Sequence, residues 1–240
     1  MSRVRAALPV LMLVSVASVP AFATLLTIQN PGFETGNLTQ VGNGTFSQLI
    51  SGSTIFAAGG TLANWTASST TTNAAAGGFA PSAGGNNWTS TWWSGNNIGY
   101  LQISSAGIVS LSQTLTDSLQ NNTVYNLSAL IGRRTFTPSL NYSLELFAGS
   151  TLLTSASNLA LASNSFGTDT ATYSSGSGNP LAGQSLKIVL QSTGTNVFTE
   201  AFFDNVTLNA TGPVTGVPEP GSIVLGAVGL SLLLLRRRAL

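Results

Sequence analysis

The chain has 240 residues, and only 6% of them are charged, against roughly 25% in an ordinary soluble domain. It contains neither cysteine nor histidine, so it has no disulfide, no thiol nucleophile and no histidine-based catalytic triad. Between the two terminal segments three basic residues face six acidic ones, a net charge of −3. That balance argues against a nucleic-acid partner, because phosphates must be neutralised by clustered lysine and arginine.

The first 23 residues read MSRVRAALPVLMLVSVASVPAFA and have the three parts of a secretory signal peptide. Arg3 and Arg5 give the positive start, and an apolar stretch follows. Ala21 and Ala23 then provide the small residues that signal peptidase accepts before its cleavage site. We therefore expect residues 1–23 to be removed and the mature chain to begin at Thr24. The alternative is an uncleaved membrane anchor.

The body of the chain, residues 24–210, is rich in glycine, serine, threonine and asparagine, and apolar and polar residues alternate through it. This pattern is typical of short strands joined by polar turns. We expect strands at 25–28, 98–103, 108–115, 124–131, 142–146, 151–154, 168–173, 186–190 and 201–208.

The spacing of these strands, roughly ten residues, predicts an all-β fold, a single jelly-roll-like β-sandwich. The stretch 36–97 has the weakest pattern, and we expect long loops there with two or three strands. A body of this length is sufficient for one sizeable core.

Two short motifs lie at opposite ends of the body: Asn30-Pro-Gly-Phe-Glu34 and Phe203-Asp-Asn-Val-Thr-Leu208. Together they resemble the galactose-binding-like β-sandwich modules, which include carbohydrate-binding modules. The resemblance implies that the first and last strands are neighbours and that a structural calcium lies between them. Glu34 and Asp204 would be its ligands, with the Asn30 carbonyl as a weaker candidate. The alternative is a turn carboxylate at Glu34 and a strand-end Asp204, each bonded to backbone amides.

The tryptophans are concentrated in one third of the chain. Trp92 and Trp93 are adjacent, so on a strand their side chains would point to opposite faces and at most one would enter the core. An exposed tryptophan suits the apolar face of a sugar ring, and Asn96 and Asn97 could bond its hydroxyls. These four residues are therefore candidates for ligand binding.

The alternative for the aromatic residues is structural. In that interpretation Trp65 and Trp88 belong to the core, and the remaining tryptophan covers a loop.

Catalysis has little support in the sequence. A glycosidase needs two facing carboxylates, and nothing in the surroundings of Glu145, Asp169 or Glu200 favours a pair. The adjacent Arg133 and Arg134 could meet an acidic polysaccharide, or they could be a solvated strand end. We therefore expect a protein that is not an enzyme.

We expect residues 211–216, TGPVTG, to form an exposed linker, and a three-part tail follows at 217–240. A Pro-Glu-Pro motif precedes an uncharged run at 221–235 and an arginine cluster. At about 1.5 Å per residue a helix of this run measures about 22 Å, short of the ~30 Å hydrocarbon core. It would therefore be a weak, temporary transmembrane anchor, with the arginines on the cytoplasmic side.

This tail resembles the PEP-CTERM sorting signal of Gram-negative bacteria, which is also known as an ice-binding protein C-terminal domain. The resemblance implies that an exosortase-type enzyme processes the chain near the motif and releases it to the cell surface or extracellular matrix. An ordinary single-span anchor is the alternative. The residues that carry the signal are Val217, Pro218, Glu219, Pro220, Arg236, Arg237 and Arg238.

These features together predict an exported, non-catalytic surface or matrix protein that binds exopolysaccharide. The second hypothesis is a structural or adhesive matrix protein without a specific glycan, and the third is a hydrolase.

Overall fold

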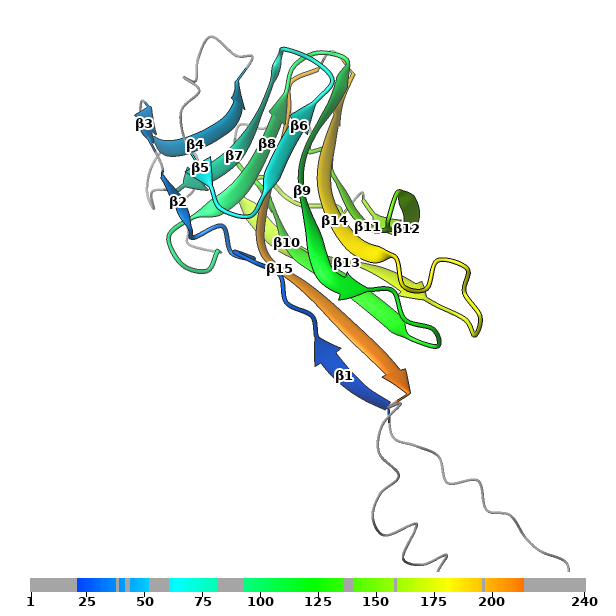
Figure 1. The fold of residues 1–240 in the computed structure, drawn as a ribbon. Coiled ribbons are helices and arrows are strands. Elements are labelled where there is room, and N and C mark those ends of the chain that lie inside the picture. The colour runs from blue at the N-terminus through cyan, green and yellow to red at the C-terminus, as the bar shows by residue number, and fades with distance from the viewer. Residues whose placement is uncertain are drawn as a thin grey trace, which may run out of the picture. The chain divides into compact units, whose positions relative to one another are not determined.

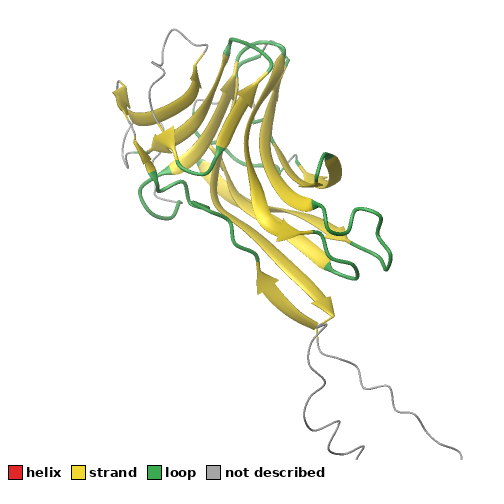
Figure 2. Ribbon diagram, in the orientation of Figure 1, coloured by secondary structure: helices red, strands yellow, loops and turns green. Residues whose placement is uncertain are grey.

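The computed structural model describes residues 21–37, 39–41, 44–51, 61–81, 93–135, 140–157, 159–195 and 197–213. Residues 23–212 form one compact unit; almost all of the second unit, 1–22 with 213–240, lies outside these ranges. Within the described ranges the chain consists of strands and loops (Figure 2). No helix in the described part is long and apolar enough to cross a membrane. The apolar run at 221–235 lies outside it.

The larger of the two main sheets has eight antiparallel strands, in the order β13-β10-β15-β8-β7-β4-β3, with β1 paired to β15 (Figure 1). These strands are β1 (Ala21–Leu25), β3 (Thr39–Val41), β4 (Gly44–Ser51), β7 (Ala74–Ala80), β8 (Ile98–Ile103), β10 (Val124–Arg133), β13 (Ser165–Ser174) and β15 (Thr199–Pro213).

The second sheet has five antiparallel strands in the order β12-β11-β14-β9-β6, and β2 and β5 form a small ribbon of their own. These strands are β2 (Gly36–Asn37), β5 (Thr61–Leu62), β6 (Thr66–Ser69), β9 (Gly107–Ser118), β11 (Ser143–Ala148), β12 (Thr151–Ala156) and β14 (Ser185–Gly194).

The two main sheets pack face to face around one apolar core, so the fold is an all-β sandwich (Figure 1). In strands such as β9, β10 and β11 alternate residues point into the core, as the two-residue period of a strand requires. On β15, for example, Ala201 and Phe203 are fully buried in the core, and Leu111 and Leu190 face them from the five-stranded sheet. The predicted β-sandwich is confirmed.

From residue 98 onward every predicted strand is present and most are longer than predicted. The strand predicted at 25–28 lies instead at Ala21–Leu25. The stretch 36–97 was predicted wrongly, because it holds six strands, β2 to β7, in its described part. Strand β7, Ala-Ala-Ala-Gly-Gly-Phe-Ala, is almost wholly buried, and its small residues show no apolar alternation that a sequence pattern could reveal.

Candidate functional site

The face of the eight-stranded sheet that points away from the core carries a row of aromatic and glycine residues. Cross-strand pairing aligns Phe166 with Gly132, Gly132 with Phe202, Phe202 with Tyr100, and Tyr100 with Gly77. Paired residues share a face of the sheet. Five strands, from β13 to β7, therefore supply one continuous row, which we call the aromatic floor.

The glycines of this row leave room for the rings beside them. A Cβ atom on Gly132 would lie within 3.0 Å of three atoms of the Phe166 ring, so the ring occupies the space that a side chain would fill. The backbone of β10 is thereby covered by an aromatic ring from the neighbouring strand.

Further apolar side chains join the floor and form a cluster separate from the sandwich core. Ala75, Phe79, Ile98, Tyr100 and Phe202 are buried in it, and the rings of Phe79 and Phe202 lie 5.8 Å apart.

Trp93 covers part of this cluster. Its ring lies 6.2 Å from that of Phe166, at an interplanar angle of 52°. Trp93 is one of the predicted ligand-binding residues, and it is half-buried against the cluster. Trp92 and Trp88 lie outside the described residues, and Trp65 is in the core, stacked on Phe33 at 5.1 Å.

A charged pair lies beside the floor. Glu200 is two residues before Phe202 on β15, so both side chains point to the same face, and Gln102 of β8 is its cross-strand neighbour. Arg134 follows the end of β10 and forms an ion pair with Glu200: a terminal nitrogen donates a hydrogen bond to one carboxylate oxygen, and Nε lies against the other. The side chain of Glu200 is only 5% exposed and that of Arg134 is 19% exposed.

The three carboxylates considered in the sequence are not brought together as a pair. Glu145 lies on β11 of the other sheet and accepts a hydrogen bond from the Ser143 hydroxyl. Asp169 on β13 accepts one from the Tyr142 hydroxyl. Of the three, Glu200 is the one that forms an ion pair in the described structure, so it is the carboxylate that the fold distinguishes.

Asp204 lies further along β15, at a β-bulge. Asn205 has a φ of +48°, and the pairing between β10 and β15 shifts register there. The bulge resets the alternation, so Asp204 is on the outer face while Val206 returns to the core. Asp204 is fully buried and accepts the backbone N–H groups of Ser94 at 2.7 Å and Asn205 at 2.8 Å.

Glu34 reaches the same loop. It accepts the backbone N–H groups of Asn96 at 3.0 Å and Asn97 at 3.1 Å, and the Asn97 side-chain amide donates to its carbonyl. The loop wraps closely, since a Cβ on Gly95 would collide with the Glu34 carboxylate. Asn96 and Asn97, predicted to meet a sugar, therefore position Glu34.

The pKa of Asp204 is raised to about 6, mainly by burial and also by the nearby negative charge of Glu34, although its two backbone hydrogen bonds lower the pKa. The two carboxylates thus lie close enough to repel each other. The expected neighbourhood of the Glu34 turn and the Asp204 strand is present: the Val206 N–H also donates to Pro31 at 3.0 Å.

The third predicted calcium ligand, Asn30, is already occupied in the described structure. Its carbonyl accepts the Trp65 indole N–H at 2.9 Å and the Phe33 N–H at 3.2 Å. Its side chain bonds the backbone of Thr35 and Ala63. Asn30 therefore organises the turn that presents Glu34. Among the described residues there is no group of three or more acidic side chains that could hold a metal.

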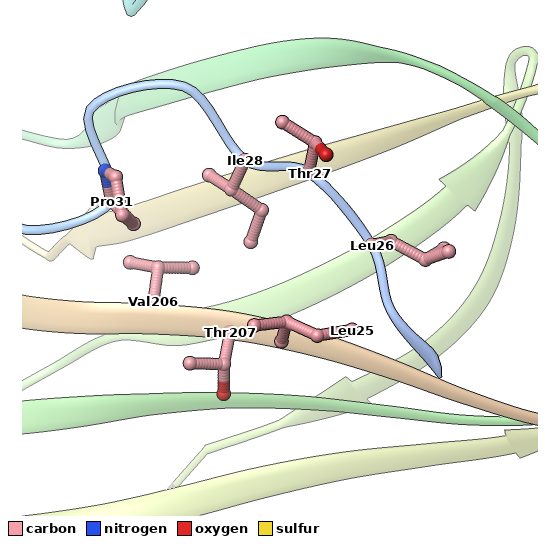
Figure 3. A pocket seen from close by; sticks show the side chains of 7 residues that line it. All are labelled: Leu25, Leu26, Thr27, Ile28, Pro31, Val206 and Thr207. Carbon is pink, nitrogen blue, oxygen red and sulfur yellow. The ribbon is translucent and has the colours of Figure 1, made fainter. Parts of the chain in front are cut away.

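A groove of about 260 Å³ lies elsewhere on the sandwich, between the segment that follows β1 and strand β15 (Figure 3). Figure 3 shows Leu26, Ile28 and Pro31 on one side and Val206 and Thr207 on the other. Its lining is mostly apolar and has no charged side chain, so it offers no group for chemistry.

Fold and site together define a β-sandwich whose outer sheet face combines an aromatic floor with a buried, arginine-paired carboxylate. The HpiC1-like family, described as HpiC1 cyclase, matches residues 24–209. The chain belongs to this HpiC1-like family. No curated protein sequence matches it.

Solved structures of two cyclases are also similar to this chain. The Stig cyclase Fisc from Fischerella sp. TAU, in complex with (3Z)-3-(1-methyl-2-pyrrolidinylidene)-3H-indole, is 26% identical with a TM-score of 0.64, over 79% of this chain and 98% of that one. A cyclase from Fischerella sp. TAU in complex with 4-(1H-indol-3-yl)butan-2-one is 25% identical with a TM-score of 0.63, over 80% and 100% of the two chains.

These matches correct the functional expectation. The prediction of a non-catalytic, polysaccharide-binding surface protein is wrong, because the body belongs to a family of cyclases. The resemblance to carbohydrate-binding modules extends only to the sandwich: one in complex with β-1,4-galactotriose matches at 14% identity and a TM-score of 0.43, too remote to indicate function. The absence of histidine and cysteine excluded only the catalysts that require them.

Among the remaining predicted residues, Ala21 and Ala23 lie in β1. The tail residues Val217, Pro218, Glu219, Pro220, Arg236, Arg237 and Arg238 lie outside the described residues.

Proposed function

We propose that this protein is a cyclase that closes a ring within an indole-bearing substrate on the outer face of the eight-stranded sheet. The observation that carries the proposal is the aromatic floor with the Glu200–Arg134 pair beside it, in a chain of the HpiC1-like family. Two cyclases of this fold are in complex with indole compounds. A row of aromatic rings suits offset-stacked or edge-to-face contact with a bicyclic aromatic ligand.

The chemistry needs a group that moves protons. When an unsaturated side chain closes onto an indole ring, the side chain takes up one proton and the ring carbon that forms the new bond loses one. The electrons of the broken C–H bond restore the aromatic ring, and the product is an isomer of the substrate. Neither an oxidant nor a reductant is required.

Glu200 is our candidate for the base that receives the proton. It is on the same face as Tyr100 and Phe202, and its pairing with Arg134 favours the charged, proton-accepting form. The apolar surroundings exclude water, which strengthens the electrostatic interaction with a positively charged intermediate.

The experiment has two parts. Binding of 4-(1H-indol-3-yl)butan-2-one to residues 24–213 is measured by calorimetry. Turnover of a panel of 3-substituted indoles with alkenyl side chains is followed by chromatography and NMR, which detect an isomer with one more ring. We expect binding, conversion of at least one indole, and a loss of about 10²–10⁴-fold in turnover for Glu200→Gln. Failure to bind or convert any indole would overturn the proposal.

We further propose that Glu34 and Asp204 hold a structural calcium ion. Two mutually repelling carboxylates on adjacent segments are hard oxygen ligands of the kind that calcium prefers, and backbone carbonyls would supply others. The ion would cancel their repulsion and stabilise the loop after Trp93. Its role would be structural, with no step of the reaction assigned to it.

We also infer that the cyclase is exported. The signal-peptide pattern at 1–23 and the Pro-Glu-Pro tail at 217–240 support cleavage by signal peptidase and sorting by an exosortase-type enzyme after a brief membrane stage. Cell fractionation with an antibody against the body tests this. We expect a released form shortened at both ends, and Pro218→Ala with Glu219→Ala should retain the protein in the membrane; uncleaved protein in the cytoplasm would contradict it.

A further inference from the structure

In the Glu200–Arg134 pair a carboxylate is buried, and burial of its charged form is electrostatically unfavourable. A carboxylate with 5% side-chain exposure, beside the buried rings of Phe202 and Tyr100, has lost most of its hydration. Such burial favours the neutral acid, which cannot accept a proton. A proton-accepting Glu200 therefore requires a compensating group.

Arg134 has the geometry to be that group. One terminal nitrogen donates a hydrogen bond to one oxygen of Glu200 and Nε lies against the other oxygen, so the planar guanidinium forms a fork against the carboxylate. This contact holds the carboxylate in one plane and also favours its ionised form. A lysine, with a single ammonium group, would supply the charge alone.

The strand geometry explains why Arg134, rather than its neighbour, makes this pair. Arg134 follows Gly132 by two residues, so it continues the row of outer-face positions at the end of β10. Arg133 has the opposite orientation along the strand and donates to the Leu161 carbonyl at 3.0 Å. The chain thus contains a matched control one residue away.

Among the described residues, the other titratable groups near this face are Tyr100, on the strand paired with β15, Asp204, four residues along β15 from Glu200, and Glu34, whose charge acts on Asp204. Gln102, directly across from Glu200, is neutral at every pH. Arg134 brings a positive charge into direct contact with Glu200.

We propose that Arg134 is a positioning residue of the cyclase: it holds Glu200 in one orientation and in the ionised form, and so sets the lowest pH at which the site works. This inference rests on the proposed function, in which Glu200 accepts the proton. It adds that the activity of Glu200 depends on a second residue that does not itself contact the reacting atoms.

The first test measures ionisation without activity. The chain has four glutamates, so selective ¹³C labelling of their carboxyl groups gives few NMR signals, and Glu200→Gln assigns the one of interest. We expect the Glu200 signal to titrate at a pH at least one unit higher in Arg134→Gln than in the parent protein. An unchanged titration would overturn the inference.

The second test uses the pH dependence of turnover. Arg134→Gln should lower kcat at neutral pH by about 10²-fold with KM changed less than about threefold, and the loss should shrink as the pH rises. Arg134→Lys should keep the acid limb of the profile near its original position and lose about tenfold in kcat, because the fork is missing. In a Glu200→Gln background, Arg134→Gln should cause no further loss.

Controls separate this inference from the proposed function and from a folding defect. Arg133→Gln should leave the acid limb where it is. Adding methylguanidinium to Arg134→Gly should restore activity, which an unfolded variant could not show. If the parent protein converts no indole, the proposed function fails while the NMR titration still decides the role of Arg134. The inference is wrong if Arg134→Gln lowers activity equally at every pH and also lowers the activity of Glu200→Gln by the same factor as that of the parent protein.

Discussion

The backbone N–H of Ser94 donates to the carboxylate of Asp204, 110 residues later in the chain, at 2.7 Å. The residue before Ser94 is Trp93, which packs on Phe166 at the edge of the aromatic floor. The loop 94–97 is therefore anchored at one end of the floor by the carboxylates of Asp204 and Glu34. Trp93, directly before this loop, packs against the aromatic cluster. The position of Trp93 depends on Asp204 and Glu34.

Replacing Asp204 by asparagine should loosen this loop. An amide has one acceptor oxygen, so one of the N–H groups of Ser94 and Asn205 would lose its partner. We expect a loss of about 1–3 kcal/mol in the free energy of unfolding and a red-shifted Trp93 emission, isolated by subtracting the spectrum of Trp93→Phe. Asp117→Asn is the control, and equal effects of both substitutions would contradict the assignment.

Calcium should stabilise the protein through Glu34 and Asp204. We expect the melting temperature of the parent to rise with added calcium and to fall after chelation, because ligand that binds only the folded state stabilises it. Glu34→Gln should remove most of this response. If calcium stabilises Glu34→Gln and the parent equally, the ion binds elsewhere.

The stability of the chelated protein should depend on pH through Asp204. Its pKa is raised from 3.8 to about 6 by burial and by Glu34, so the folded state binds a proton more tightly than the unfolded state. The stabilisation is complete below about pH 4 and is lost as the pH rises through about 6, by an amount on the order of 2 kcal/mol. Urea titrations in EDTA at several pH values measure it. This loss of stability with rising pH should be smaller in Asp204→Asn. A parent protein that becomes more stable over the same pH range, while Asp204→Asn does not, would contradict the assignment.

The arrangement of rings in the aromatic floor should depend on Gly132. A Cβ at this position would collide with the Phe166 ring, so Gly132→Ala must displace the ring. We expect a loss of about 1–3 kcal/mol in stability and weaker binding of 4-(1H-indol-3-yl)butan-2-one in calorimetry. The control is Gly176→Ala, where a Cβ meets nothing within 4 Å. Unchanged indole binding in Gly132→Ala would mean that the ligand does not contact this part of the sheet.

Much of the architecture was readable in advance from strand periodicity. The segments around Leu111 and Leu127 alternate because each has one face in the core, and both are strands. Strand β7 escaped prediction for the opposite reason: both of its faces are buried, one against the core and one within the aromatic cluster, so its sequence does not alternate. Two motifs at opposite ends also correctly placed Glu34 near Asp204.

The candidate site was not readable in this way. Glu200 was one of three equivalent carboxylates in the sequence, and Arg134 one of two adjacent arginines. Nothing local relates residues 134 and 200, and the pair exists because β10 and β15 are neighbours in the sheet. The adjacent Trp92 and Trp93 suggested a sugar platform, whereas Trp93 packs on the ring of Phe166, which belongs to a strand distant in sequence.

The sequence by itself determined an all-β chain with no thiol or imidazole chemistry, because residue types and two-residue periodicity are local properties. The tertiary structure alone decided which face of the sheet is aromatic, which carboxylate is paired and which loop holds Trp93. Those facts depend on strand order and register, which bring together residues that have no relationship along the chain.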